Sequence, residues 1–266
     1  RHQGALPRRV HARGGRRMRG VALPALGALG FIALWWLAVL AGVADPVLLP
    51  SPAETWRDTW QALARGPLLH DFAQTVRRTV LAFLLASAIG VPLGILLGAR
   101  ERLYRTCEFV VDFFRSTPAS ALFPLFLVLF GVGEGTKVAV AAFGAALVIL
   151  FNTAYGVMNA RRTRILAAQV MGASPLRVMT DVLVYEAAPQ ILVGMRSGVS
   201  LALVIVVVAE MFIGSVDGLG QRVIVAQSLF ESGLMYGVIF LAGALGYALN
   251  LFFLILEKRF VHWGGK

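Results

Sequence analysis

Cysteine and charged residues are both scarce in this sequence. Among 266 residues there is one cysteine, Cys107, so no internal disulfide can form and too few thiolates are present for a zinc or iron–sulfur site. Charged residues make up only 15% of the chain, hydrophobic residues make up 58%, and the mean hydropathy is +0.75. This composition excludes a soluble globular protein of this size.

Two catalytic motifs are absent as well. The sequence has no G-x-x-x-x-G-K-S/T phosphate loop, and the run from Gly131 to Gly135 is interpreted as a turn between membrane spans. It also lacks H-E-x-x-H, and none of its four histidines lies inside an apolar run, which argues against a membrane metalloprotease. We therefore expect a chain that is not an enzyme, with no catalytic residues, no metal site and no cofactor of its own.

Six apolar runs are long enough to cross a membrane, since the hydrocarbon core of a bilayer takes about 20 helical residues. They predict an all-α, polytopic membrane protein with six transmembrane helices. The predicted spans are 21–43, 72–98, 110–131, 138–158, 188–213 and 234–256.

The net charge of +11 is concentrated in alternate connections between these runs. Of the 25 Lys and Arg residues, 17 lie in the connections 1–20, 99–109, 159–187 and 257–266. The intervening connections hold only four, in 44–71, 132–137 and 214–233. Because Lys and Arg are retained on the cytoplasmic side, both termini are expected there. The charge is thus a topology signal, and a nucleic-acid partner is not expected.

The expected domain organisation is one membrane domain with two short tails. Residues 1–20 are predicted to be a disordered basic cytosolic tail, 21–258 the transmembrane domain and 259–266 a cytosolic C-terminal tail. Met18 immediately precedes Arg19-Gly20 and the first apolar run. Residues 1–17 are therefore either a genuine basic tail or a segment upstream of the natural start.

A short helix is predicted after the first span. Ser51-Pro52-Ala53-Glu54 combines a capping serine, a proline suited to the first helical position and a glutamate that can bond back to the cap. Trp56 and Trp60 follow one turn apart, which favours an interfacial helix with both indoles at headgroup depth. A loop helix without a specific role and a docking helix for a partner remain alternatives.

Small residues repeat every four positions in two of the spans and allow close helix packing. The two stripes are Gly90-Gly94-Gly98 and Gly194-Gly198-Ala202. Packing within the chain is favoured over a subunit interface. Pro92 and Pro124 are expected to kink their helices unless neighbouring groups satisfy the freed carbonyls.

The longest predicted cytoplasmic connection, 159–187, carries an ordered pattern of small residues. It contains Ala167-Ala168, then Gly172-Ala173-Ser174-Pro175-Leu176, then Ala187-Ala188-Pro189. This order resembles the cytoplasmic coupling loop of type I ABC importer permeases. Small residues let a short helix lie flat in a cleft of another protein, and the glycine turn redirects the chain into a second helix that transmits motion.

Further matches narrow the resemblance to permeases for nitrate, sulfonate, taurine and bicarbonate-type anions. In order they include Leu49-Pro50-Ser51-Pro52, Gly90-Val91-Pro92-Leu93-Gly94, Arg115-Ser116-Thr117-Pro118, Phe130-Gly131-Val132-Gly133, Asn152-Thr153, Ala209-Glu210-Met211 and Gly218-Leu219-Gly220. Two positions depart from the family pattern, since Leu166 stands where Glu is usual and Tyr185 where Pro is usual.

The resemblance implies a permease subunit that forms the pathway for a small anion by alternating access, in the bacterial cytoplasmic (inner) membrane. ATP and Mg would belong to separate ABC ATPase subunits. The residues implied in coupling to them are Ala167, Ala168, Gly172, Ala173, Ser174, Pro175 and Leu176. The other implied partners are a second copy or a related permease, an extracytoplasmic substrate-binding protein and the lipid bilayer.

Polar groups within or beside apolar spans are candidates for the substrate pathway, because burying them in hydrocarbon is costly. The candidates are Arg115, Ser116, Thr117, Ser120, Asn152 and Arg196. Arg115 has an alternative role as a partner of Asp112, and Arg196 has one as a structural ion pair. Arg78 is expected either to anchor its span or to attract anions, and Glu210 to serve as a structural partner or outer gate.

Two other classes of function remain open. A secondary transporter without an ATPase would show uptake that does not need ATP, whereas a membrane receptor or scaffold would bind partners without ligand flux.

Overall fold

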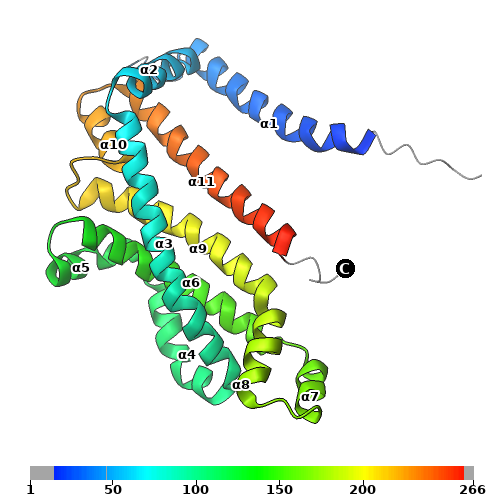
Figure 1. Cartoon of the computed structure of the whole chain (residues 1–266). Helices are drawn as coiled ribbons and strands as arrows, with labels where there is room; N and C mark the ends of the chain where they lie inside the picture. The colour runs from blue at the N-terminus through cyan, green and yellow to red at the C-terminus, as the bar shows by residue number, and fades with distance from the viewer. Residues whose placement is uncertain (1–14, 46, 261–266) are drawn as a thin grey trace, which may run out of the picture.

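The computed structural model describes residues 15–45 and 47–260, and this part of the chain is helical without a β-strand (Figure 1). The helices are α1 (Gly15–Leu40), α2 (Pro52–Arg65), α3 (Leu68–Ala99), α4 (Glu101–Ser116), η1 (Ala119–Leu122), α5 (Phe123–Phe130), α6 (Glu134–Met158), α7 (Arg162–Val170), α8 (Pro175–Arg177), η2 (Val178–Leu183), α9 (Val184–Phe212), α10 (Leu219–Ser228) and α11 (Ser232–Phe260). Most of the predicted N-terminal tail and of the C-terminal tail, 1–14 and 261–266, lies outside the described residues.

Four of the predicted spans are confirmed as helices that are long and apolar enough to cross a membrane. They are α3, α6, α9 and α11, and α9 continues a helical run that begins at Pro175. In α1 the apolar stretch whose side chains are described, Leu26–Leu40, is shorter than these four helices.

The predicted span at 110–131 is a bent pair of helices rather than one continuous helix. The chain breaks after α4, and α4 and the segment Ala119–Phe130 are bent by 93°. Thr117 precedes Pro118 and is extended, with φ −80° and ψ 124°, because a proline ring disfavours the helical conformation of the residue before it. Pro124 lies in the first turn of α5, where a proline is tolerated. If the bent pair crosses as one span, the described residues hold up to five spans.

The helices α3, α6 and α9 form the centre of the bundle (Figure 1). A Cβ atom on Gly94 of α3 would lie 2.7 Å from the carbonyl oxygen of Leu150 in α6, so only glycine permits this approach. Gly198 of α9 meets α6 in the same way, at Ile149. Both small-residue stripes therefore pack within the chain, as predicted.

The bundle has two distinct ends. The helices α2 and α10 lie at one end, and α7 and α8 lie at the other (Figure 1). The predicted start of α2 is confirmed, since Ser51 Oγ accepts a hydrogen bond from the Glu54 amide at 3.2 Å. Trp56 and Trp60 stack on the exposed face of this helix.

Candidate functional site

The connection 159–187 folds as two short helical segments around a glycine turn. At the end of α7 the Gly172 amide donates to the Gln169 carbonyl at 2.9 Å, and the Ala173 amide donates to the Ala168 carbonyl at 3.0 Å. This is the hydrogen-bond pattern of a Schellman motif, which places a residue in the left-handed region. Gly172 occupies that position with φ +80°, which explains why the sequence has glycine there.

The second half of the connection leads directly into α9. Ser174 caps α8 by accepting from the Arg177 amide at 3.4 Å, and Pro175 occupies the first turn of that helix. The segment η2 then takes π-helical geometry, which is rare and concentrates at functional sites. An ion pair between Arg164 of α7 and Glu186 of α9 ties the two halves together.

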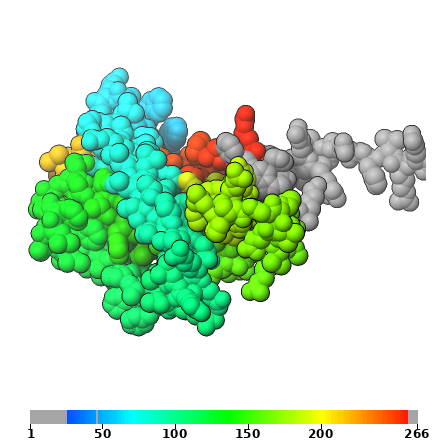
Figure 2. Space-filling view, turned by 60° about the horizontal axis from the view of Figure 1, so that its bottom comes forward, coloured from blue at the N-terminus to red at the C-terminus, as the bar shows by residue number. Residues whose placement is uncertain are grey.

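The tip of this connection exposes large apolar side chains. Met171 is 81% exposed and Val170 is 89% exposed, and Leu166 and Leu176 are also exposed. We call these four residues the apolar tip. Ala168 and Val178 are buried on the inner side, so the outward position of the tip follows from the packing of the segment. Figure 2 shows the segment as a projection at this end of the molecule.

The apolar tip was only partly found from the sequence. Leu176 was predicted as a contact, but Val170 and Met171 were missed because a short apolar run does not reveal which of its residues face outward. Leu166, which stands where Glu is usual in the resembling permeases, belongs to this exposed surface. Contacts made through it would be apolar rather than ionic.

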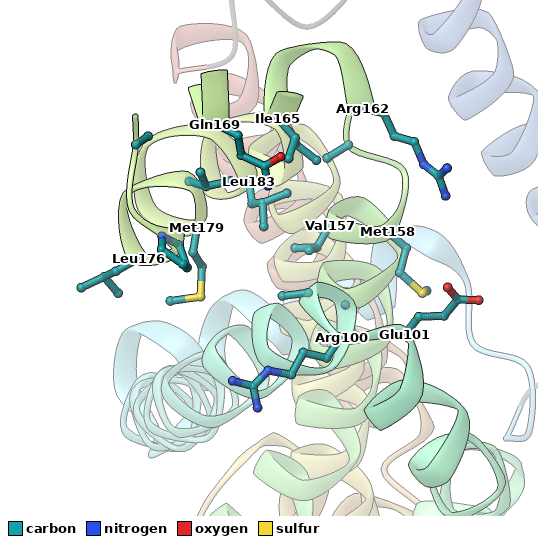
Figure 3. Close-up of a pocket in the computed structure, with 16 residues that line it drawn as sticks. Arg100, Glu101, Val157, Met158, Arg162, Ile165, Gln169, Leu176, Met179 and Leu183 are labelled. Atoms are coloured by element: carbon teal, nitrogen blue, oxygen red, sulfur yellow. The ribbon is translucent and has the colours of Figure 1, made fainter. Parts of the chain in front are cut away.

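A cavity of about 830 Å³ separates the connection from the bundle. In Figure 3, Ile165, Gln169 and Leu183 of the connection lie on one side, and Val157 and Arg100 lie on the other. The charged ends of Arg100 and Arg162 point away from each other and do not converge on a common point (Figure 3). Arg100 and Arg162 therefore do not form an anion-binding arrangement in this cavity.

Four of the predicted pathway residues gather at the break between α4 and α5. Arg115 and Ser116 end α4, Thr117 Oγ1 donates to the Phe113 carbonyl at 2.9 Å, and Ser120 lies in η1. Arg115 contacts Asp112 at 3.2 Å and lies over the ring of Phe151, with its Cζ 4.4 Å from the ring centroid. The sequence analysis gave pairing with Asp112 as the alternative role of Arg115, and this contact is present. The side chain of Arg115 is still partly exposed.

The other two candidates lie on different helices. The side chain of Asn152 in α6 accepts a hydrogen bond from Gln190 in α9 at 3.1 Å, which is an interhelical role. Arg196 in α9 contacts Glu257 of α11 at 3.3 Å, whereas Glu186 pairs with Arg164. Arg115 and Arg196 are thus each paired with a carboxylate of their own, Asp112 and Glu257.

A buried ionic network occupies the opposite end of the bundle. Arg78 of α3 binds Glu134 through Nε and Nη2 at 2.7 and 2.8 Å, and Glu210 through Nη1 at 2.7 Å. The remaining donors of Arg78 bind the side chain and the carbonyl of Asp217. All five guanidinium donors are therefore used within the chain. The interpretation that Arg78 attracts anions is wrong, because its side chain is only 2% exposed.

Neighbouring side chains complete this network. Glu210 also accepts from Thr75 at 2.9 Å and from the Gly220 amide at 3.0 Å, which confirms it as a structural partner. Lys137 donates to Glu134 at 2.9 Å. Burial raises the pKa of Asp217, but the hydrogen bond from Arg78, the charge of Arg78 and the hydrogen bond from His70 together outweigh it, so the Asp217 pKa is lowered.

The sequence analysis named Arg78 and Glu210 but missed the links between them. Asp217 and Glu134 lie in the predicted loops 214–233 and 132–137. Carboxylates are common in loops, so neither residue stood out in the sequence. The spacing of Glu134 and Lys137 by three residues was the one local signal available for this network. Among the described residues, no group of three or more His, Cys, Asp or Glu is placed to hold a metal ion.

A bundle of apolar helices, with two short helices around a glycine turn at one end, defines the fold of a type I ABC transporter permease. A chain of the MetNI methionine ABC transporter, in an inward-facing conformation, has the same fold, with a TM-score of 0.65 and 22% sequence identity. The match covers 73% of this chain and 96% of that chain.

The sequence comparisons identify the family. The model of the binding-protein-dependent transport system inner membrane component family matches residues 90–263, and the chain belongs to this family. It is accordingly a multi-pass protein of the inner membrane and a transport permease.

Full-length relatives carry the same description. A chain described as an ABC transporter permease protein in Methanocaldococcus jannaschii is 31% identical over 91% of this chain and 91% of its own length. The taurine transport system permease protein TauC of Escherichia coli is 26% identical over 88% of this chain and 87% of its own. The bicarbonate transport system permease protein CmpB of a Synechocystis strain is 28% identical over 91% and 90%.

Proposed function

We propose that this chain is the permease of an importer that moves a small anion of the sulfonate, taurine or bicarbonate type by alternating access. ATP hydrolysis takes place on separate ABC ATPase subunits, and a substrate-binding protein delivers the anion on the opposite side of the membrane. The names of the relatives support this class of substrate.

The exposure of the apolar tip is the observation that supports docking of an ATPase on the 159–187 connection. An exposed apolar surface on a projecting segment marks an interaction site, since leaving it in water is unfavourable. The connection runs without a break through η2 into α9, which packs in the centre of the bundle. Movement of the docked tip therefore reaches the core of the permease directly.

Reconstitution of the complex tests the proposal. The chain is purified with its ATPase, placed in lipid vesicles and supplied in turn with taurine, an alkylsulfonate or bicarbonate bound to a binding protein. We expect uptake of one of these anions only with ATP. Uptake without the ATPase would instead identify a secondary transporter, and partner binding with no flux of any probe would identify a receptor or scaffold.

We also propose that two permease chains form one pathway, as copies or as related chains. Mass measurement of the intact complex tests this. A single permease chain in an actively transporting complex would contradict it.

A further inference from the structure

A groove between α9 and α11 is polar at one end and apolar at the other. Its volume is about 750 Å³. The polar lining comes from Arg196, Ser197 and Ser200 of α9 and from Tyr247 and Asn250 of α11. The remaining lining consists of aliphatic residues and glycine. Polar groups thus gather at one level of two otherwise apolar helices.

Arg196 keeps most of its hydrogen-bonding capacity at this level. One nitrogen, Nη1, contacts Glu257 at 3.3 Å, which is longer than the ~2.7–2.9 Å typical of a charge-assisted hydrogen bond. The Arg196 side chain is 29% exposed. A guanidinium carries five donors, and within residues 15–45 and 47–260 only one of those of Arg196 is used, so the others are available to a ligand in the groove. Arg78 differs, since all of its donors are used inside the chain.

Two further donors flank this guanidinium. Ser197 follows Arg196 directly and is exposed, and Asn250 lines the groove from the facing helix. Neither side chain makes a hydrogen bond to the described part of the chain. Unsatisfied donors beside a cation are costly in a membrane helix, and in such helices they mark ion or substrate pathways.

We propose that the polar end of this groove is a contact point for the transported anion, with Arg196 supplying the charge and Ser197 and Asn250 supplying neutral donors. The ligand class is a small anion with a singly charged oxygen headgroup, such as a sulfonate or bicarbonate. This inference rests on the proposed import function. An anionic lipid headgroup has the same chemistry, so the test separates the two sources.

Access of water to the groove is the first measurement. Ser197→Cys and Asn250→Cys are made in a Cys107→Ser background and treated with an anionic methanethiosulfonate, with Leu251→Cys as the control. Leu251 is adjacent to Asn250 and exposed, but it does not line the groove. We expect fast labelling of both groove positions, slow labelling of the control, and protection by taurine or bicarbonate without ATP. Equal labelling of all three positions, or protection by anionic lipid alone, would overturn the inference.

Uptake by the assembled complex is the second measurement. We expect Arg196→Gln to lower uptake about tenfold, as for loss of one charged hydrogen bond, while basal ATPase activity is kept. Arg196→Lys should retain part of the uptake. Glu257→Gln removes the ion pair but leaves the cation and should transport normally. A loss in Glu257→Gln as large as in Arg196→Gln would show a structural pair and reject the inference.

The two proposals fail in different ways. If the wild-type complex imports none of the probes, the import function fails while the labelling pattern still reports on anion binding. The groove assignment alone fails if wild-type import is normal, Arg196→Gln takes up the anion as well as wild type does, and the anion does not protect the groove positions from labelling.

Discussion

The guanidinium of Arg78 lies 2.7 Å from the carboxylate of Glu210, although the two residues are 132 positions apart in the sequence. Their side chains are 2% and 0% exposed. Arg78 also binds Glu134 at the start of α6 and Asp217 just before α10. One arginine therefore connects three helices and a loop at the end of the bundle opposite the apolar tip.

Loss of either member of this pair should destabilise the permease strongly. Arg78→Met leaves the fully buried Glu210 carboxylate without a cation, and removing one member of a buried ion pair costs about 3–5 kcal/mol. Glu210→Gln should have a smaller effect in the same direction, because an amide still accepts from Thr75 and Gly220. Thermal unfolding of the detergent-purified chain measures both effects. Arg77→Met is the matched control, since Arg77 is exposed and its one side-chain hydrogen bond to the described residues goes to Gln74; equal losses at positions 77 and 78 would contradict the network.

The contribution of Asp217 should depend on pH. Its folded pKa is lowered, although burial opposes this, because Arg78 stabilises the carboxylate. The stabilisation is then fully present above the ordinary aspartate pKa of about 3.9 and is lost as the pH falls through the lower folded value. The difference in melting temperature between wild type and Asp217→Asn should shrink as the pH falls below about 4, through the folded pKa of Asp217. A difference that grows in acid would have the wrong sign.

Gly172→Val should uncouple transport without preventing membrane insertion. Nothing lies within 4 Å of a Cβ at this position, so the expected cost is the left-handed backbone, about 1–2 kcal/mol for a residue with a side chain. We expect a fall in uptake and in transport-stimulated ATPase activity, with normal amounts of protein in the membrane. Gly135→Val is the control, because Gly135 also has open space but lies in a right-handed helix. Normal coupling in Gly172→Val would count against the assigned loop.

The sequence predicted features that depend on local patterns. The cap of α2 at Ser51, the left-handed turn at Gly172 and the close packing of the glycine stripes each follow from residues a few positions apart. Long-range pairs were not predictable, since Arg78 and Asp217 meet only after the helices have packed. Hydropathy alone gives 110–131 as one span, because it averages over a window and does not register one extended residue before Pro118.

The apolar tip should control binding of the ATPase. Val170→Asp places a charge on a side chain that is 89% exposed, so it should leave folding intact and prevent burial in an apolar cleft. We expect the ATPase to be lost when the permease is purified by affinity tag. Val216→Asp is the matched control, since Val216 is 96% exposed in the loop between α9 and α10, and α10 lies at the other end of the bundle. Retention of the ATPase by Val170→Asp would place the docking site elsewhere.

Substitutions of Arg115, at the break between α4 and α5, distinguish a role in the substrate pathway from a structural role. Its contact with Asp112 is 3.2 Å long and both side chains are nearly half exposed, so the pair alone contributes little stability. If Arg115 attracts the substrate, Arg115→Gln should weaken anion uptake and Arg115→Lys should retain part of it, because lysine keeps the charge. If Arg115 only pairs with Asp112, then exchanging the two residues in a double variant should restore the uptake that each single change loses. Full uptake by Arg115→Gln in a complex with normal ATPase coupling would exclude the pathway role and leave Arg196 as the charged candidate.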